Sequence, residues 1–107
     1  MNVNLAISKS TAEHLANLEL DDTSDVDQKL IRLLEAEYGR RLARYRLIDR
    51  QLQKKYGMTL VEFEQQQVTQ RFNYSWDVES DSIAWETAVD GIRTMHKKLN
   101  ELHSEER

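Results

Sequence analysis

Apolar residues recur along this chain at spacings of three, four and seven positions, which is the pattern of amphipathic helices. The longest stripe consists of Leu30, Ile31, Leu34, Tyr38, Leu42, Tyr45, Ile48, Leu52 and Tyr56. A second stripe consists of Val78, Trp85, Ala88, Ile92, Met95, Leu99 and Leu102. The pattern therefore predicts two long helices, over residues 25–56 and 76–104.

The first long helix has signals at both of its ends. Ser24 or Asp25 can cap its first turn. Lys54 and Lys55 lie in its last turn, where the helix dipole favours positive charge. Gly57 follows at the position where a left-handed residue usually ends a helix. Together these signals place the helix between residues 25 and 56.

A short helix is expected directly after this stop. Thr59 and Glu62 have the spacing of a capping box. Met58 and Phe63 stand at the two positions of a hydrophobic staple around the same cap. These signals predict a connecting helix over residues 60–69.

The N-terminal segment shows a different pattern. Apolar residues alternate with polar ones at its start, as in a β-strand, at Val3, Leu5 and Ile7. Ser10 and Glu13 resemble a capping box, which predicts a short helix that ends near Leu20. We therefore expect an N-terminal arm over residues 1–24, made of a strand and a short helix.

The length of the first long helix determines the expected shape. At 1.5 Å per residue, about 32 residues span about 48 Å. A compact domain of 100 residues has a radius of gyration of only about 13 Å. We therefore expect an all-α fold in which residues 25–107 form an elongated hairpin of two long helices.

Charge favours an antiparallel hairpin. From Arg40 to Lys55 the charged residues are basic except for Asp49, whereas from Asp77 to Asp90 they are all acidic. An antiparallel arrangement brings these two halves side by side. Each exposed ion pair contributes less than about 1 kcal/mol, so such pairs matter mainly for orientation and register.

Some apolar residues lie outside the two stripes, among them Leu33, Leu47 and Val89. Leftover apolar surface on a thin hairpin is normally covered by a second copy or by a partner. We therefore predict a homodimer of hairpins that forms a four-helix arrangement. Gly91 costs about 1 kcal/mol relative to Ala inside a helix. It therefore indicates a close helix crossing, and we place the dimer contact there as a hypothesis.

The composition fits a cytoplasmic protein. The 107 residues contain no proline and no cysteine and have a formal net charge of -4. The lack of cysteine excludes a disulfide framework and a thiol nucleophile. No apolar run approaches the roughly 20 residues of a membrane span, and the segment from Met1 to Ser10 lacks the pattern of a secretory signal.

No motif indicates catalysis or a cofactor. His96 and His103 are seven residues apart, too far along one helix to share a metal ion. Asp77 and Asp81 share a helix face, but the Glu-x-x-His string of four-helix metal sites is absent. There is also no Gly-rich phosphate loop and no G-x-S-x-G string. We expect no enzymatic activity, no metal and no cofactor.

An arginine-rich stretch is the candidate for nucleic-acid binding. The arginines could contact phosphate while Tyr45 stacks on a base. The residues concerned are Arg40, Arg41, Arg44 and Arg46. The acidic half of the last helix could neutralise them instead, and we favour that interpretation. A nucleic-acid-binding regulator is therefore the alternative function.

Large apolar residues gather around the turn between the long helices, at Tyr56, Met58, Phe63, Phe72, Tyr74 and Trp76. They form either a small core that closes the hairpin or exposed anchors for a protein partner, with Tyr74 and Trp76 as the candidate anchors. The alternation at Val3, Leu5 and Ile7 has two interpretations as well. The arm either packs on the bundle or pairs with another chain as an added strand.

Two strings lie around this turn: Tyr56-Gly57-Met58-Thr59 with Glu62-Phe63, and WDVESDSIAWE from Trp76 to Glu86. Together they resemble a group of small helical prokaryotic proteins of the antitoxin type, whose genes are often found next to toxin genes. The resemblance covers residues 42–99 and leaves out residues 1–24. It implies a cytoplasmic module that binds a partner protein and neutralises a toxin encoded alongside.

Overall fold

The computed structural model describes residues 6–18 and 25–105. These residues form helices α1 (Lys9–Asn17), α2 (Val26–Tyr56), α3 (Leu60–Gln65), α4 (Val68–Arg71) and α5 (Trp76–Glu105). No strand occurs within the described ranges, so the all-α prediction is confirmed for them. Of the expected N-terminal strand, Val3 and Leu5 lie outside these ranges, and Ile7 belongs to neither a helix nor a strand.

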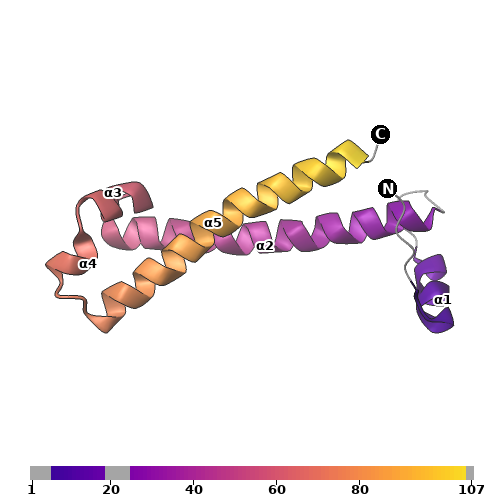
Figure 1. Ribbon diagram of the computed structural model, residues 1–107, viewed down its shortest axis with the longest axis horizontal. Helices are drawn as coiled ribbons and strands as arrows, with labels where there is room; N and C mark the ends of the chain where they lie inside the picture. The colour runs from indigo at the N-terminus through magenta and orange to yellow at the C-terminus, as the bar shows by residue number, and fades with distance from the viewer. Residues whose placement is uncertain (1–5, 19–24, 106–107) are drawn as a thin grey trace.

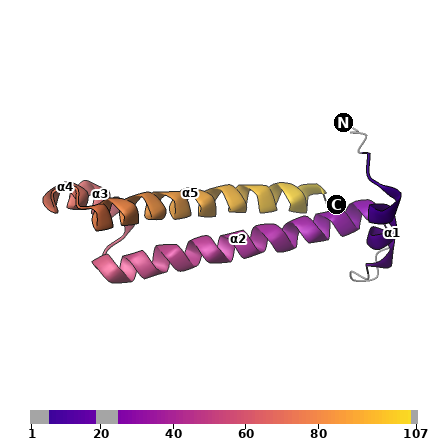
Figure 2. The same ribbon diagram turned by 90° about the horizontal axis from the view of Figure 1, so that it is seen from below.

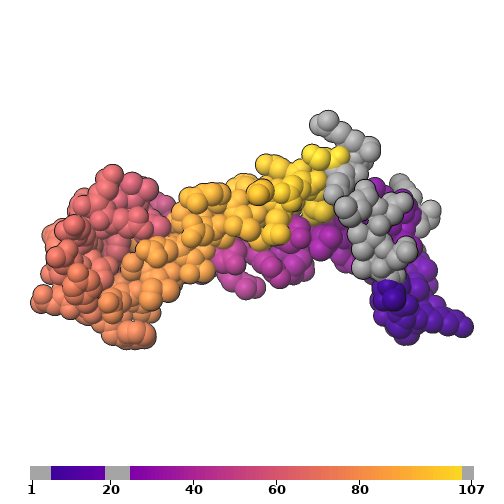
Figure 3. All heavy atoms as spheres, viewed as in Figure 1, coloured from indigo at the N-terminus to yellow at the C-terminus, as the bar shows by residue number. Residues whose placement is uncertain are grey.

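The two long helices, α2 and α5, lie side by side, cross, and run in opposite directions (Figures 1 and 2). α3 and α4 lie at the end where α2 stops and α5 begins, whereas α1 lies at the other end of α2. The molecule measures 57 × 28 × 26 Å, and its elongated outline is visible in Figure 3.

The ends of α2 follow the sequence signals. The Asp25 carboxylate accepts a hydrogen bond from the Asp27 backbone N–H at 3.0 Å and so caps the helix. Gly57 has a φ of 65°, in the left-handed region, and its N–H donates to the Gln53 carbonyl at 2.7 Å. These contacts satisfy backbone groups that a helix end leaves without intrahelical partners.

The capping box that begins α3 is present. The Thr59 hydroxyl accepts from the Glu62 N–H at 3.2 Å, and the Glu62 carboxylate accepts from the Thr59 N–H at 3.1 Å. However, the prediction of one helix over residues 60–69 is wrong, because Gln67 is left-handed with a φ of 52°. Five residues along a continuous helix separate two side chains by about 140°. The break lets Phe63 and Val68 both be buried in one core.

α1 begins two residues earlier than expected. Ser8, rather than Ser10, caps the helix, and its hydroxyl accepts from the Thr11 N–H at 3.1 Å. Both serines are suitable cap residues, but Ser8 also gains a hydrogen bond of 2.8 Å with the Thr11 hydroxyl. The described part of the helix ends at Asn17, short of the expected end near Leu20, which lies outside the described ranges.

A buried lysine fixes α1 against α2. Lys29 on α2 is only 4% exposed, and its ammonium group donates to the carbonyls of Leu15 and Ala16, each at 3.1 Å. These carbonyls belong to the last turn of α1, where the helix dipole favours a positive charge. The buried charge is thus compensated by the end of a neighbouring helix.

Most residues of the two predicted stripes are buried or half-buried between the helices. Leu34 is an exception, with 42% of its surface exposed. Lys55 contacts Asp81, and Tyr45 lies against Gly91. This register places Leu34 at the level of the last turns of α5.

Gly91 marks a close approach between α5 and a side chain of α2. A Cβ atom built on Gly91 would lie 2.5 Å from the Cδ2 and Cε2 atoms of the Tyr45 ring. The close crossing indicated by this glycine therefore occurs within one hairpin. The same construction at Gly39, which lies inside α2, meets nothing within 4 Å.

These two glycines give a matched pair for a stability test. Gly39→Ala should raise the free energy of unfolding by up to about 1 kcal/mol, because alanine favours the helix. Gly91→Ala should lower it by about 1 kcal/mol, because the overpacking cost of about 1–3 kcal/mol exceeds that gain. Urea denaturation followed by circular dichroism at 222 nm measures both. Equal stabilisation by the two changes would contradict the close contact with Tyr45.

Candidate functional site

The hairpin end near α3 contains an aromatic core. Trp85 and Phe63 are 0% and 2% exposed. Tyr56 stacks on Trp85 with ring centroids 5.8 Å apart, and Phe63 meets Tyr56 and Trp85 edge-on at 5.0 and 5.1 Å. Edge-on and offset contacts of this kind are favourable for aromatic rings. This half of the aromatic group therefore closes the hairpin.

Asp49, the acidic exception in the basic half of α2, has a structural role. The Trp85 indole N–H donates to its Oδ1 atom at 2.8 Å, and the Gln53 amide donates to its Oδ2 atom at 3.1 Å. A buried indole needs such an acceptor. Asp49 therefore links α2 to the centre of the aromatic core.

Asp81 interrupts the apolar seam of α5 and forms a second link to α2. Its Oδ2 atom accepts from the Lys55 ammonium and from the Tyr56 hydroxyl, each at 2.6 Å. Burial raises the pKa of Asp81, but the hydrogen bonds from Lys55 and Tyr56 and the charge of Lys55 outweigh it and lower the pKa below 3.8. Burial, together with the Asp81 carboxylate, raises the pKa of Tyr56 to about 12.

The other aromatic residues near the turn are exposed. Phe72, Tyr74 and Trp76 are 56%, 58% and 75% exposed, and we call them the tip patch. The two interpretations of the aromatic group thus apply to different members. Tyr56 and Phe63 are packed in the core, whereas both candidate anchors, Tyr74 and Trp76, face solvent.

Tyr74 is held in a strained turn. Asn73 and Tyr74 both have a φ of 55°, in the left-handed region, which costs about 1–3 kcal/mol for a residue other than glycine. The Tyr74 N–H donates to the Thr69 carbonyl at 2.9 Å, and the Asn73 N–H donates to the Gln70 carbonyl at 3.0 Å. These bonds to α4 hold the backbone of the turn that carries the exposed tyrosine.

Two hollows lie next to each other along α5. The first, of about 380 Å³, is lined by Thr69, Tyr74, Glu79, Ser82, Ile83 and Glu86. The second, of about 280 Å³, is lined by Leu60, Val61, Glu64, Glu86, Val89, Asp90 and Arg93. Because Glu86 lines both hollows, the two lie next to each other, and we refer to them together as the acidic groove.

Sequence reasoning missed this groove. Ile83 in the first hollow is 62% exposed. A signal for it was available, because Trp76 and Ile83 are seven residues apart and therefore share a face of α5 that lies off the seam. Val61, also 62% exposed, carried no comparable signal, because its place in the groove depends on how α3 packs on α5.

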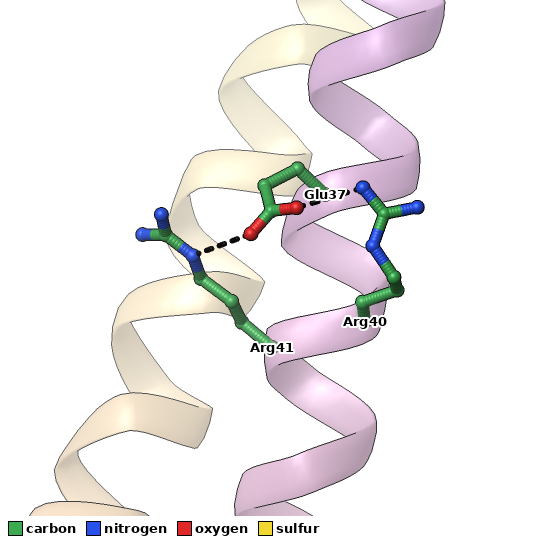
Figure 4. Close-up of polar contacts among 3 residues, drawn as sticks. All are labelled: Glu37, Arg40 and Arg41. Atoms are coloured by element: carbon green, nitrogen blue, oxygen red, sulfur yellow. Dashed lines mark hydrogen bonds and ion pairs between the residues drawn. The ribbon is translucent and has the colours of Figure 1, made fainter.

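Two of the candidate nucleic-acid-binding arginines are held by Glu37 on the same helix. Glu37 accepts from Arg40 Nη2 at 2.7 Å and from Arg41 Nε at 3.0 Å. Figure 4 shows the carboxylate between the two guanidinium groups. The hydrogen bonds from Arg40 and Arg41 lower the pKa of Glu37. Compensation of these arginines thus comes from within α2 and not from the acidic half of α5.

The remaining candidate arginines differ from each other. Arg46 Nη2 lies 2.9 Å from His96 Nε2 on α5, so this arginine takes part in the contact between the long helices. Arg44 is exposed. Three of the four candidates therefore have neighbours within the chain that explain their positions.

Comparison with known proteins adds no family: no protein-family model, curated protein or solved structure matches this chain. Among the described residues, no three metal-ligating side chains gather closely enough to hold an ion. Nor does any helix in those ranges have the length and apolar character needed to cross a membrane.

The contact at Asp81 predicts how stability depends on pH. Its lowered pKa in the folded chain gives stability that is present above pH 3.8 and is lost as the pH falls through the folded-state pKa. Asp81→Asn should therefore lower the free energy of unfolding by about 1 kcal/mol at pH 7. Between pH 7 and pH 3 the free energy of unfolding of this variant should fall less than that of the wild type. Urea denaturation at pH 7 and pH 3 measures both effects. Glu101→Gln, an exposed control on α5 outside the acidic groove, should behave like the wild type. Equal acid sensitivity of Asp81→Asn and the wild type would contradict the assignment.

Proposed function

We propose that the chain is a non-enzymatic protein-interaction module of the antitoxin type, which binds and neutralises a partner toxin. The observation that supports this most is the tip patch, in which Phe72, Tyr74 and Trp76 are each more than half exposed beside a separate aromatic core. Exposed aromatic residues of this kind dominate the binding energy of protein interfaces. The resemblance of the same region to antitoxin-type proteins points in the same direction.

The N-terminal arm contributes a second contact in this proposal. Ile7 is 51% exposed and lies outside the helices. Val3 and Leu5 alternate with it in the sequence, so the arm can add a strand to a sheet edge of the partner.

Self-association completes the proposed function. We propose that two hairpins associate in a four-helix arrangement in the cytoplasm. Leu33 and Leu47, which lie off the buried stripe of α2, are 40% and 50% exposed. A second copy that covers these residues would remove apolar surface from water. Each Å² removed would stabilise the dimer by about 25 cal/mol.

Co-expression with the product of the adjacent gene tests the partner. Wild-type chain should relieve growth inhibition by that product and should purify with it as a complex. Trp76→Ala, at the most exposed residue of the tip patch, should weaken the complex by at least about tenfold, as expected for an aromatic anchor. Val26→Ala, at an exposed apolar residue at the other end of α2, is the control and should bind as the wild type does. Failure of the wild type to bind or protect would contradict the proposal.

A further inference from the structure

The acidic groove carries apolar and negatively charged side chains that the hairpin leaves uncovered. Ile83 and Val61 are each 62% exposed. Glu79 and Glu86 line the same hollow as Ile83, and neither forms an ion pair with another residue in the described ranges. An occupant that complements this surface therefore needs an apolar side chain next to positive charge.

The outer side of α2 has both of these properties. Leu47 is 50% exposed, and Arg44 and Arg50 are exposed residues three positions before and after it. This spacing places all three on one side of the helix. Unlike Arg40 and Arg41, neither Arg44 nor Arg50 forms an ion pair within the described part of the chain. We call Arg44, Leu47 and Arg50 the basic strip.

The two complementary surfaces lie at the same level of the hairpin. The Asp49–Trp85 and Lys55–Asp81 contacts bring the second half of α2 beside the first half of α5. The basic strip lies in the second half of α2, and the acidic groove lies mainly along the first half of α5. In a dimer with a two-fold axis, each contact occurs twice, so the strip of each copy can meet the groove of the other.

We propose that a second copy of the chain binds the acidic groove through its basic strip, with Leu47 against Ile83, Arg44 facing Glu86 and Arg50 facing Glu79. The inference rests on the homodimer proposed above and specifies the surfaces that form it. Phe72 and Trp76 do not line the groove, so this part of the tip patch stays accessible to a different protein.

A charge exchange tests this pairing in the purified full-length chain. Glu86→Arg and Arg44→Glu each bring like charges together and should raise the dimer Kd by at least about tenfold. The double variant restores opposite charges and should return the Kd to within about threefold of the wild type. Glu101→Lys, an exposed change on α5 outside the groove, is the matched control and should leave the Kd unchanged. Sedimentation velocity gives the Kd values, and circular dichroism at 222 nm checks that each variant keeps its helices.

The outcomes separate this pairing from the rest of the proposed function. A dimer that is unaffected by either single change, or a double variant whose losses simply add, overturns the pairing and leaves the homodimer standing. A wild-type chain that stays monomeric at the highest concentration measured overturns both the pairing and the homodimer. Binding of the toxin is decided separately by the co-expression experiment.

Discussion

The hydrogen bond from Trp85 to Asp49 is the interaction on which the arrangement of the long helices depends. The indole is completely buried, so its N–H must find an acceptor inside the protein, and the Asp49 carboxylate provides one at 2.8 Å. With this pair in place, Gly91 faces the ring of Tyr45 and Asp81 reaches the end of α2. The apolar seam alone would allow a slip by one turn, whereas these polar and steric contacts favour one register.

The sequence predicted the helices well where the signals are local. Asp25, Gly57 and the capping box at Thr59 act within a few residues, so they can be recognised without knowing the fold. The break at Gln67 and the buried Lys29 could not be predicted in this way. The break at Gln67 depends on the burial of Val68 in the core. The burial of Lys29 depends on the carbonyl groups at the end of α1.

The candidate site was predictable only in part. Sequence alone could not separate Tyr74 from Phe63, because both are aromatic residues near the same turn, and only packing decides which one is buried. The charge pattern indicated that Arg40 and Arg41 have acidic neighbours, but it suggested the acidic half of the other helix. Glu37 compensates them, because partners three and four residues away on one helix are already within reach. The interaction function is inferred from the surfaces that the hairpin leaves uncovered.

The antiparallel register of α2 and α5 underlies every surface described above, and distances between spin labels test it most directly. The chain has no cysteine, so pairs can be introduced at Lys54 with Ser80 and at Lys54 with Glu101. Labelled chain diluted with unlabelled chain reports distances within one hairpin. The account predicts a short distance for the first pair and a distance of about 30 Å for the second, because 21 residues of helix separate positions 80 and 101. A short distance between positions 54 and 101 and a long one between positions 54 and 80 would contradict it.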